Sequence, residues 1–191
     1  MNICAYGAAA KEIDARFIRA GEELGKRIAL RGDTLVFGGG AHGMMGALSR
    51  GAHENGGRVI SVAPSFFNVD GVLYEKCDEY IYTETMRERK QKMEDLSDAF
   101  IVTPGGIGTF EEFLEIFTLR QLHRHQKPIA IFNVSGYYNS MMKFLRNAVD
   151  NRFMSEKNLE LFFISDSIDE ILSYIDAPPK KEEDIEKLRN L

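Results

Sequence analysis

Three glycine clusters follow short apolar segments, which is where a chain places backbone amides that bind phosphate. The clusters are Gly7 with the three alanines after it, Gly38–Gly40, and Gly105–Gly106 with Gly108. Glycine lets backbone N–H groups approach a ligand without a side chain in the way, and a helix that begins there adds unpaired amides and a partial positive charge. Each cluster alone could be only a tight turn, but three of them favour phosphate or nucleotide binding.

The second cluster matches a dinucleotide-binding pattern only in part. Gly38, Gly40 and Gly43 fit GxGxxG after an apolar segment, and His42 inside this pattern is a further candidate for ligand contact. No lysine followed by serine or threonine comes after the glycines, and no acidic residue that would bind ribose is evident about 20 residues on. The hypothesis of an oxidoreductase with a dinucleotide cofactor therefore depends on this weak match alone and is not favoured.

The helical segment Met86–Ser97 places an arginine among its apolar residues. Met86, Met93 and Leu96 mark an apolar stripe at helical spacing, and Arg89 points the same way because it lies three residues after Met86 and four before Met93. An inward arginine requires an anionic partner, since leaving its charge unpaired is costly. The alternatives are a long side chain that reaches the surface and an ordinary ion pair.

Three glutamates, Glu111, Glu112 and Glu115, follow the third glycine cluster. The packed face of that helix is expected to comprise four apolar residues: Phe110, Phe113, Leu114 and Phe117. All three glutamates would then lie off the packed face. Acidic residues near the start of a helix also stabilise its dipole, so spacing alone does not select one of the three as catalytic.

These candidates need a framework of strands that alternate with helices. Strands are expected at Asn2–Tyr6, Thr34–Phe37, Arg58–Ala63, Ala99–Thr103, Pro128–Phe132 and Phe162–Ser165. Helices are expected at Lys11–Leu30, Gly43–Glu54, Met86–Ser97, Gly108–Leu122, Tyr137–Val149 and Ile168–Ile175. The strands are mostly continuous apolar runs, which is typical of strands covered on both faces. The alternation predicts an α/β fold with a mainly parallel sheet and helices on both faces.

Ligands of open parallel sheets bind at the carboxyl ends of the strands, and the glycine clusters lie at three such ends. The stretch Pro64–Tyr82 is the least regular part of the chain and could form a lid or a wall of the site. We assign residues 1–176 to one domain, because 191 residues suit a single core. Residues 177–191 contain Pro178 and Pro179 and are expected to form a charged helical tail.

The composition excludes several partners. The net charge of −5 provides no basic field for nucleic acid, and no apolar run approaches the roughly 18 residues of a membrane span. The start of the chain lacks the features of a signal peptide. Cys4 and Cys77 are isolated, so they form neither a disulfide framework nor a zinc pattern. His123 and His125 do not share a helix face, so no metal site is expected. We interpret the protein as cytoplasmic.

Two motifs together resemble a known family. "MRERK" at Met86–Lys90 and "PGGIGTFEE" at Pro104–Glu112 are similar to the RK…PGGxGTxxE signature of the Lonely Guy family of cytokinin-activating phosphoribohydrolases, which are often labelled lysine decarboxylases. Val36–Pro64 and Lys127–Met142 also resemble the family, and the similarity extends over Asn2–Ser165. No lysine lies in a recognisable pyridoxal-phosphate motif, so the decarboxylase label is rejected.

The resemblance implies a Rossmann-like fold and hydrolysis of a nucleoside 5′-monophosphate to a free base and ribose 5-phosphate, without metal or cofactor. It implies that Arg89 and Glu112 are the catalytic pair, and that the protein is a homodimer with its sites near the subunit boundary. The substrate- and phosphate-binding residues would be Lys90, Gly105, Gly106, Gly108, Thr109 and Thr118, together with Gly39 and Gly40 of the second cluster.

Departures from the family leave the base open. The first strand ends in "YGAAAK", and in the region before "RK" the residue Asp70 is a candidate for substrate contact. Adenine, prenylated adenine and other purine or pyrimidine bases all remain candidates for the base of the substrate. The alternative function is a non-catalytic nucleotide sensor or carrier on the same fold, but the intact pair of Arg89 and Glu112 favours the enzyme.

Overall fold

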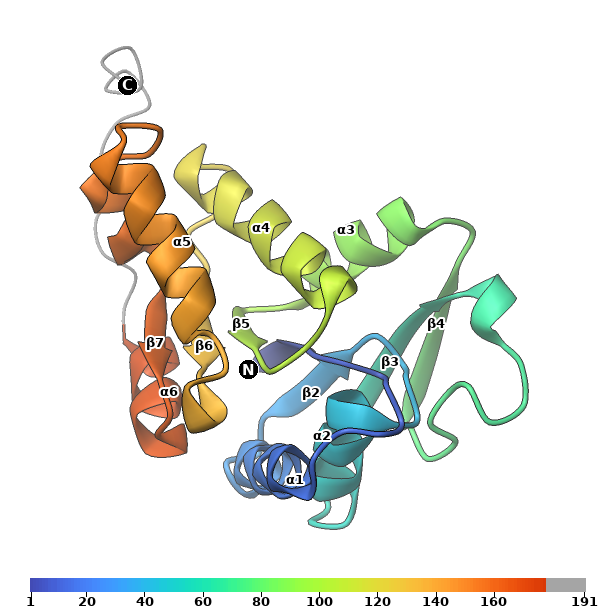
Figure 1. The fold of residues 1–191 in the computed structure, drawn as a ribbon. Coiled ribbons are helices and arrows are strands. Elements are labelled where there is room, and N and C mark those ends of the chain that lie inside the picture. The colour runs from blue at the N-terminus through green and yellow to red at the C-terminus, as the bar shows by residue number, and fades with distance from the viewer. Residues whose placement is uncertain (178–191) are drawn as a thin grey trace.

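A seven-stranded sheet with every strand parallel forms the centre of this computed structural model, which describes residues 1–177 (Figure 1). The strand order is β4-β3-β2-β1-β5-β6-β7. The strands are β1 (Asn2–Tyr6), β2 (Thr34–Phe37), β3 (Arg58–Pro64), β4 (Glu79–Thr83), β5 (Ala99–Val102), β6 (Ile129–Phe132) and β7 (Phe163–Ser165). The order reverses between β1 and β5, which is the position where open α/β sheets bind ligands.

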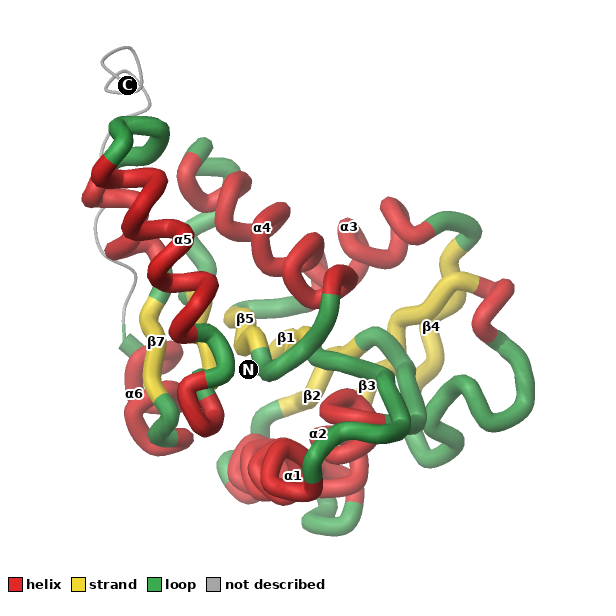
Figure 2. Tube along the Cα trace, in the orientation of Figure 1, coloured by secondary structure: helices red, strands yellow, loops and turns green. Residues whose placement is uncertain are grey.

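Helices cover both faces of the sheet (Figure 2). They are α1 (Ala15–Leu30), α2 (Gly43–His53), α3 (Met86–Leu96), α4 (Ile107–Gln121), α5 (Asn139–Asp150) and α6 (Ile168–Asp176). Short 3-10 turns occupy Ser65–Phe67, Val134–Gly136 and Glu156–Leu161. Residues of α1, α2 and α6 pack in one apolar cluster, and residues of α3, α4 and α5 pack in a second. The prediction of an α/β sheet covered on both faces is confirmed.

The central strand β1 shows why its sequence reads as continuously apolar. Ile3 and Ala5 belong to the cluster under α1 and α2, whereas Cys4 and Tyr6 belong to the cluster under α3 and α4. Successive side chains of a strand point to opposite faces, so a strand between two helical layers needs apolar residues at every position. All four are at most 2% exposed.

Apart from ends that differ by one residue, the predicted strands and helices differ from the structure at three places. The strand β4 begins inside the stretch that was expected to be irregular, and its residues are mostly half-buried because it is an edge strand. The first helix begins at Ala15 rather than Lys11, because the Asp14 side chain accepts from the Arg16 amide and caps the helix. The helix expected from Tyr137 begins at Asn139, after a 3-10 turn.

The predicted charged tail lies, except for Ala177, outside the described residues. Within residues 1–177, no helix is both long and apolar enough to cross a membrane.

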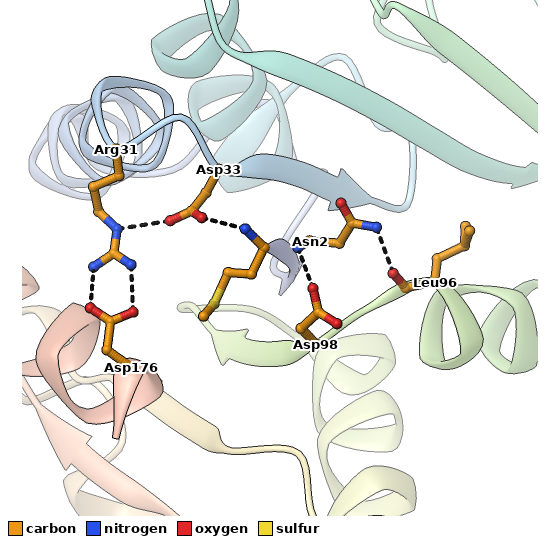
Figure 3. Close-up of polar contacts among 7 residues, drawn as sticks. Asn2, Arg31, Asp33, Leu96, Asp98 and Asp176 are labelled. Carbon is orange, nitrogen blue, oxygen red and sulfur yellow. Dashed lines mark hydrogen bonds and ion pairs between the residues drawn. The ribbon is translucent and has the colours of Figure 1, made fainter. Parts of the chain in front are cut away.

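Polar contacts join several helices and strands at the amino end of the sheet (Figure 3). Arg31, after α1, donates from Nη1 and Nη2 to the two carboxylate oxygens of Asp176 in α6, at 2.9 and 2.6 Å, and from Nε to Asp33 at 2.8 Å. Asn2 donates its amide to Asp98 at 2.7 Å and its side chain to the Leu96 carbonyl at 2.8 Å. These contacts hold the beginnings of β1 and β5 in place, at the end of the strands opposite the glycine clusters.

The pair of Arg31 and Asp176 predicts a pH-dependent contribution to stability. The Arg31 guanidinium lowers the pKa of the Asp176 carboxyl from its ordinary value of 3.8. The charged carboxylate therefore stabilises the fold above that ordinary pKa, and the contribution is lost as pH falls through the lowered value. At pH 7 we expect Asp176→Asn to lower the free energy of unfolding by at most about 1 kcal/mol, because the carboxylate is 48% exposed.

Urea unfolding of both proteins at pH 7 and near pH 2.5 measures this difference, which should be smaller at the lower pH. A difference of equal size at both pH values would show that the charge of Asp176 is not its cause.

Candidate active site

A cavity of about 510 Å³ lies at the carboxyl ends of the central strands. All three glycine clusters contribute to its lining, which includes Gly7 after β1, Gly38 and Gly40 after β2, and Gly106 and Gly108 after β5. The strand order places β2, β1 and β5 side by side, so clusters that are far apart in the sequence meet at one edge of the sheet.

A buried ion pair forms part of the cavity wall. Nη1 of Arg89 in α3 lies 2.8 Å from Oε1 of Glu112 in α4, and Nε of Arg89 donates to the Val62 carbonyl at 3.1 Å. Arg89 is 3% exposed and Glu112 is 5% exposed, and both line the cavity. The prediction that Arg89 points inward is confirmed, and its anionic partner is Glu112.

Two opposing effects act on the Glu112 carboxyl. Burial raises its pKa above the usual value, and this effect outweighs the opposing attraction of the Arg89 guanidinium, which favours the charged form. A buried ion pair contributes little net stability, because desolvation of both charges offsets their attraction. A carboxyl with a shifted pKa beside a fixed cation, in a cavity, is instead typical of groups that take part in chemistry.

Gly38 leaves the space that the Arg89 guanidinium occupies. A Cβ atom at this position would lie 1.8 Å from Nη2 of Arg89, so any side chain would displace the guanidinium. Its neighbour Gly39 has a positive φ of 84°, and a Cβ there would lie 2.6 Å from the Ser61 hydroxyl oxygen. The positive φ and the close approach of Ser61 account for glycine at position 39, which does not line the cavity. Gly40 does line the cavity.

The prediction for the packed face of α4 was wrong in its phase. Glu112 was expected off that face and Leu114 on it, but Glu112 is buried and Leu114 is 46% exposed. The buried residues are Thr109, Glu112, Phe113, Ile116 and Phe117. Their spacing of three and four residues is that of one helical face. Burial thus distinguishes Glu112 from Glu111 and Glu115, which are both exposed. Glu111 still lines the cavity at its edge with solvent, whereas Glu115 does not line it.

The beginning of α4 presents amide groups at the cavity. Gly106 precedes the helix, without a side-chain hydrogen bond to cap it, and its carbonyl accepts from the Phe110 amide at 3.0 Å. The amides of Ile107, Gly108 and Thr109 come too early in the helix to reach a carbonyl of the preceding turn. Such amides, with the helix dipole, bind anions.

Glycine occurs in this loop for two different structural reasons. A Cβ at Gly105 would lie 2.1 Å from Oγ1 of Thr109, so internal packing requires glycine there. A Cβ at Gly106 or Gly108 would meet nothing within 4 Å, and neither residue has a positive φ. The protein itself therefore does not need glycine at these two positions, which line the cavity. Glycine there keeps space free for a ligand that approaches the backbone closely.

Four of the predicted binding residues lie outside the cavity lining, and Gly39 is one of them. Gly105 is buried behind it, and Nζ of Lys90 forms ion pairs with Glu111 and Glu115 that tie α3 to α4. Thr118 is exposed and donates its hydroxyl to the Leu114 carbonyl at 2.7 Å. Thr109 does line the cavity. The binding roles of Lys90, Gly105 and Thr118 remain predictions.

The apolar part of the lining comprises Ala8, Ala9, Ala10, Met45, Phe67, Val72, Leu73 and Met86. The three alanines were recognised from the sequence with the first glycine cluster, but the other five residues were not individually assigned to the site. Phe67, Val72 and Leu73 come from the irregular stretch for which a lid or a wall of the site was predicted, and in the structure they line the cavity. Neither Asp70 nor His42 lines the cavity. Among residues 1–177, no group of His, Cys, Asp and Glu side chains is arranged to hold a metal ion.

Alanine at Gly108 and at Gly105 distinguishes a ligand-binding glycine from a packing glycine. Gly108→Ala should leave the free energy of unfolding unchanged or raise it by up to about 1 kcal/mol, because alanine favours a helix, and it should weaken phosphate binding. Gly105→Ala should lower the free energy of unfolding by about 1–3 kcal/mol through overpacking against Thr109. Denaturant unfolding and calorimetric titration with inorganic phosphate measure the two effects. Unchanged phosphate affinity in Gly108→Ala would exclude this loop as the anion site.

Comparisons with known proteins show the family of this chain. The family model described as "Possible lysine decarboxylase" matches residues 45–175. The cytokinin riboside 5′-monophosphate phosphoribohydrolase LOG of Oryza sativa subsp. japonica is 41% identical over 81% of this chain and 64% of its own length. The cytokinin riboside 5′-monophosphate phosphoribohydrolase LOG4 of Arabidopsis thaliana is 35% identical over 92% of this chain and 81% of its own length.

Solved structures share the fold at lower identity. The molybdenum cofactor binding protein from the phototrophic bacterium Rippkaea orientalis has a TM-score of 0.68 and 20% identity, over 92% of this chain and 93% of that one. The Moco carrier protein from Chlamydomonas reinhardtii has a TM-score of 0.68 and 20% identity, over 92% and 94%. At this identity the likeness shows the fold alone. The family model and the plant relatives show more: the chain belongs to the Lonely Guy (LOG) family, which that model describes as possible lysine decarboxylases.

Proposed function

We propose that this protein hydrolyses the N-glycosidic bond of a nucleoside 5′-monophosphate and releases the free base and ribose 5-phosphate. The observation that carries the proposal is the buried pair of Arg89 and Glu112 on the same cavity as the open glycine loop that begins α4. The pair supplies groups for bond cleavage, and the loop supplies a site for phosphate. The names of the plant relatives describe the same class of reaction.

The carboxylate fits the charge that develops during the reaction. Cleavage of an N-glycosidic bond places positive charge on the ribose at C1′, as in other glycoside hydrolysis. Glu112 can stabilise this charge or orient the attacking water. Water supplies the hydroxyl group to C1′, and its proton balances the negative charge on the departing base. Arg89 holds the carboxylate in place and assists departure of the base.

The loop fits the 5′-phosphate. The beginning of α4 and Thr109 line the cavity, and the space beside Gly106 and Gly108 is open. A phosphate bound there is stabilised by the helix dipole. It also anchors the nucleotide at a fixed distance from Glu112, which lies one turn further along α4.

The apolar wall fits the base. Phe67, Val72 and Met86 line the cavity and are each partly exposed, so they are available for contact with a ligand. Such a wall accepts the flat face of adenine and also an apolar substituent on it. We therefore propose AMP and cytokinin riboside 5′-monophosphates as the substrates to be compared.

A substrate panel tests the proposal against the carrier alternative. The protein is incubated with AMP, an N6-prenyl AMP and adenosine, and the free base and ribose 5-phosphate are separated by chromatography. We expect release of base from at least one monophosphate and little from adenosine, because adenosine lacks the phosphate. Tight nucleotide binding without any release of base would identify a carrier, and equal turnover of adenosine and AMP would contradict the loop assignment.

Substitution of Glu112 tests the mechanism. Glu112→Gln should keep nucleotide binding but reduce turnover on the order of 100-fold or more, as expected for a positioned catalytic group. The matched control is Glu115→Gln on the same helix, because Glu115 is exposed, forms an ion pair with Lys90 and does not line the cavity. We expect little effect in the control. Activity close to that of the unmodified protein in Glu112→Gln would remove this residue from the mechanism.

We also propose that the protein is a cytoplasmic homodimer that associates through the face covered by α4 and α5. Apolar side chains are exposed on this side of the molecule: Ile107, Leu114, Phe144 and Phe153 are 84%, 46%, 69% and 88% exposed. Large exposed apolar patches mark interaction sites.

Phe144→Asp should weaken the dimer, because it places a charge in the apolar contact. We expect light scattering at micromolar concentration to give a dimeric mass for the unmodified protein and a lower mass for the variant. Lys157→Asp, outside the apolar set, is the control. A monomeric unmodified protein would contradict the proposal, and so would an unaffected variant.

A further inference from the structure

We propose that Tyr137 is a positioning residue that fixes the peptide group between Gly105 and Gly106, so that the loop keeps its anion-binding conformation. Its hydroxyl donates to the Gly105 carbonyl at 2.7 Å. The proposal rests on the proposed function, because it takes this loop as the site of the substrate phosphate. Tyr137 does not line the cavity and therefore acts through the loop.

Every carbonyl along the loop is held by a donor of the protein. The Thr103 carbonyl accepts from the Tyr138 hydroxyl at 2.7 Å, and the Pro104 carbonyl accepts from the Ala8 amide at 3.2 Å. The next two, at residues 105 and 106, accept from the Tyr137 hydroxyl and from the Phe110 amide. A carbonyl oxygen that turned toward the cavity would repel a phosphate, so these four bonds keep the loop suitable for an anion.

The Gly105–Gly106 peptide needs such a bond most. Two glycines in succession impose little steric restriction on the rotation of the peptide between them. In a trans peptide the C=O and N–H groups point in opposite directions. When the Tyr137 hydroxyl holds the Gly105 carbonyl, the Gly106 amide is directed to the other side, and Gly106 lines the cavity. Without that bond, rotation of the peptide would exchange an amide for a carbonyl at the anion site.

The turn before α5 positions the Tyr137 side chain. Ser135 and Gly136 have positive φ values of 53° and 72°, and the Asn133 side chain accepts from the Tyr138 amide at 2.7 Å. The Tyr137 ring makes edge contacts with Tyr138 at 5.0 Å and with Phe17 at 5.7 Å between ring centroids. The ring is therefore held by neighbours that do not depend on its hydroxyl.

The two neighbouring tyrosines differ in burial, and this separates their roles. Tyr138 is 1% exposed and belongs to the apolar core, so its hydroxyl bond to Thr103 contributes to stability. Tyr137 is 42% exposed, and its hydroxyl bond holds a peptide of the loop rather than a group of the apolar core. Loss of the Tyr137 hydroxyl should therefore change the phosphate site and leave the stability of the fold nearly unchanged.

The test is Tyr137→Phe in the full chain, because phenylalanine keeps the ring contacts and removes the hydroxyl. We expect the dissociation constant for ribose 5-phosphate, measured by calorimetry, to rise about tenfold. The KM for AMP should rise by a similar factor with little change in kcat, because phosphate binding contributes alike to the ground state and the transition state. The thermal unfolding midpoint should stay the same. The control is Tyr174→Phe, which removes a hydroxyl in α6 away from the cavity.

The outcomes separate this inference from the proposed function. If the unmodified protein releases base from AMP and Tyr137→Phe binds ribose 5-phosphate equally well, the role of Tyr137 is refuted and the function stands. If the unmodified protein binds ribose 5-phosphate without any turnover, the function is refuted, and the calorimetric comparison still decides the role of Tyr137. A lower unfolding midpoint with unchanged affinity would show a structural role only. No binding of ribose 5-phosphate to the unmodified protein would overturn both.

Discussion

The ion pair between Arg89 and Glu112 is the constraint on which the site depends. The two opposite charges lie 2.8 Å apart, on residues that are at most 5% exposed. Such buried charges are tolerated only where each is held next to its partner. Arg89 lies on α3 and Glu112 on α4, so these helices must pack at one relative height and rotation. The Lys90 pairs with Glu111 and Glu115 connect the same two helices on their solvent side. Together, the inner pair and the outer pairs set the α3–α4 packing that one wall of the cavity requires.

The sheet order brings the remaining parts to this pair. Gly38 follows β2 and leaves room for the guanidinium, and the Val62 carbonyl in β3 accepts from it. The loop after β5 then places its amides beside Glu112. Because β3, β2, β1 and β5 are neighbours in the sheet, each group reaches the cavity from the end of a different strand. A rigid parallel sheet thus provides the precision that no single loop would give.

The sequence predicted most of the framework because the strands are buried on both faces. Continuous apolar runs identified six strands, while β4 escaped because an edge strand is half-exposed and carries polar residues. The inward position of Arg89 was predictable from one charge within an apolar stripe. Glu112 was not, since Leu114 suggested the wrong face of α4, and only the packed helix shows that Thr109 and Ile116 share the face of Glu112. The apolar wall could be assigned to a stretch but not to residues, because Phe67 and Val72 lie in a loop without periodicity.

Because α3 connects two strands of the sheet, the parts of the cavity differ in how well they tolerate insertions and deletions in the chain. This helix is the connection that returns the chain from the edge strand β4 to β5. One residue inserted into α3 before Arg89 would turn that side chain by about 100° about the helix axis, away from Glu112. The loop that carries Phe67 and Val72 precedes β4 and sits outside this connection. Insertions and deletions in that loop can reshape the apolar wall of the cavity, while the charged pair and the glycine loop before α4 keep their geometry. Under the proposed function, the preference for one base could therefore change with the length of this loop, without any change to the residues proposed to cleave the bond.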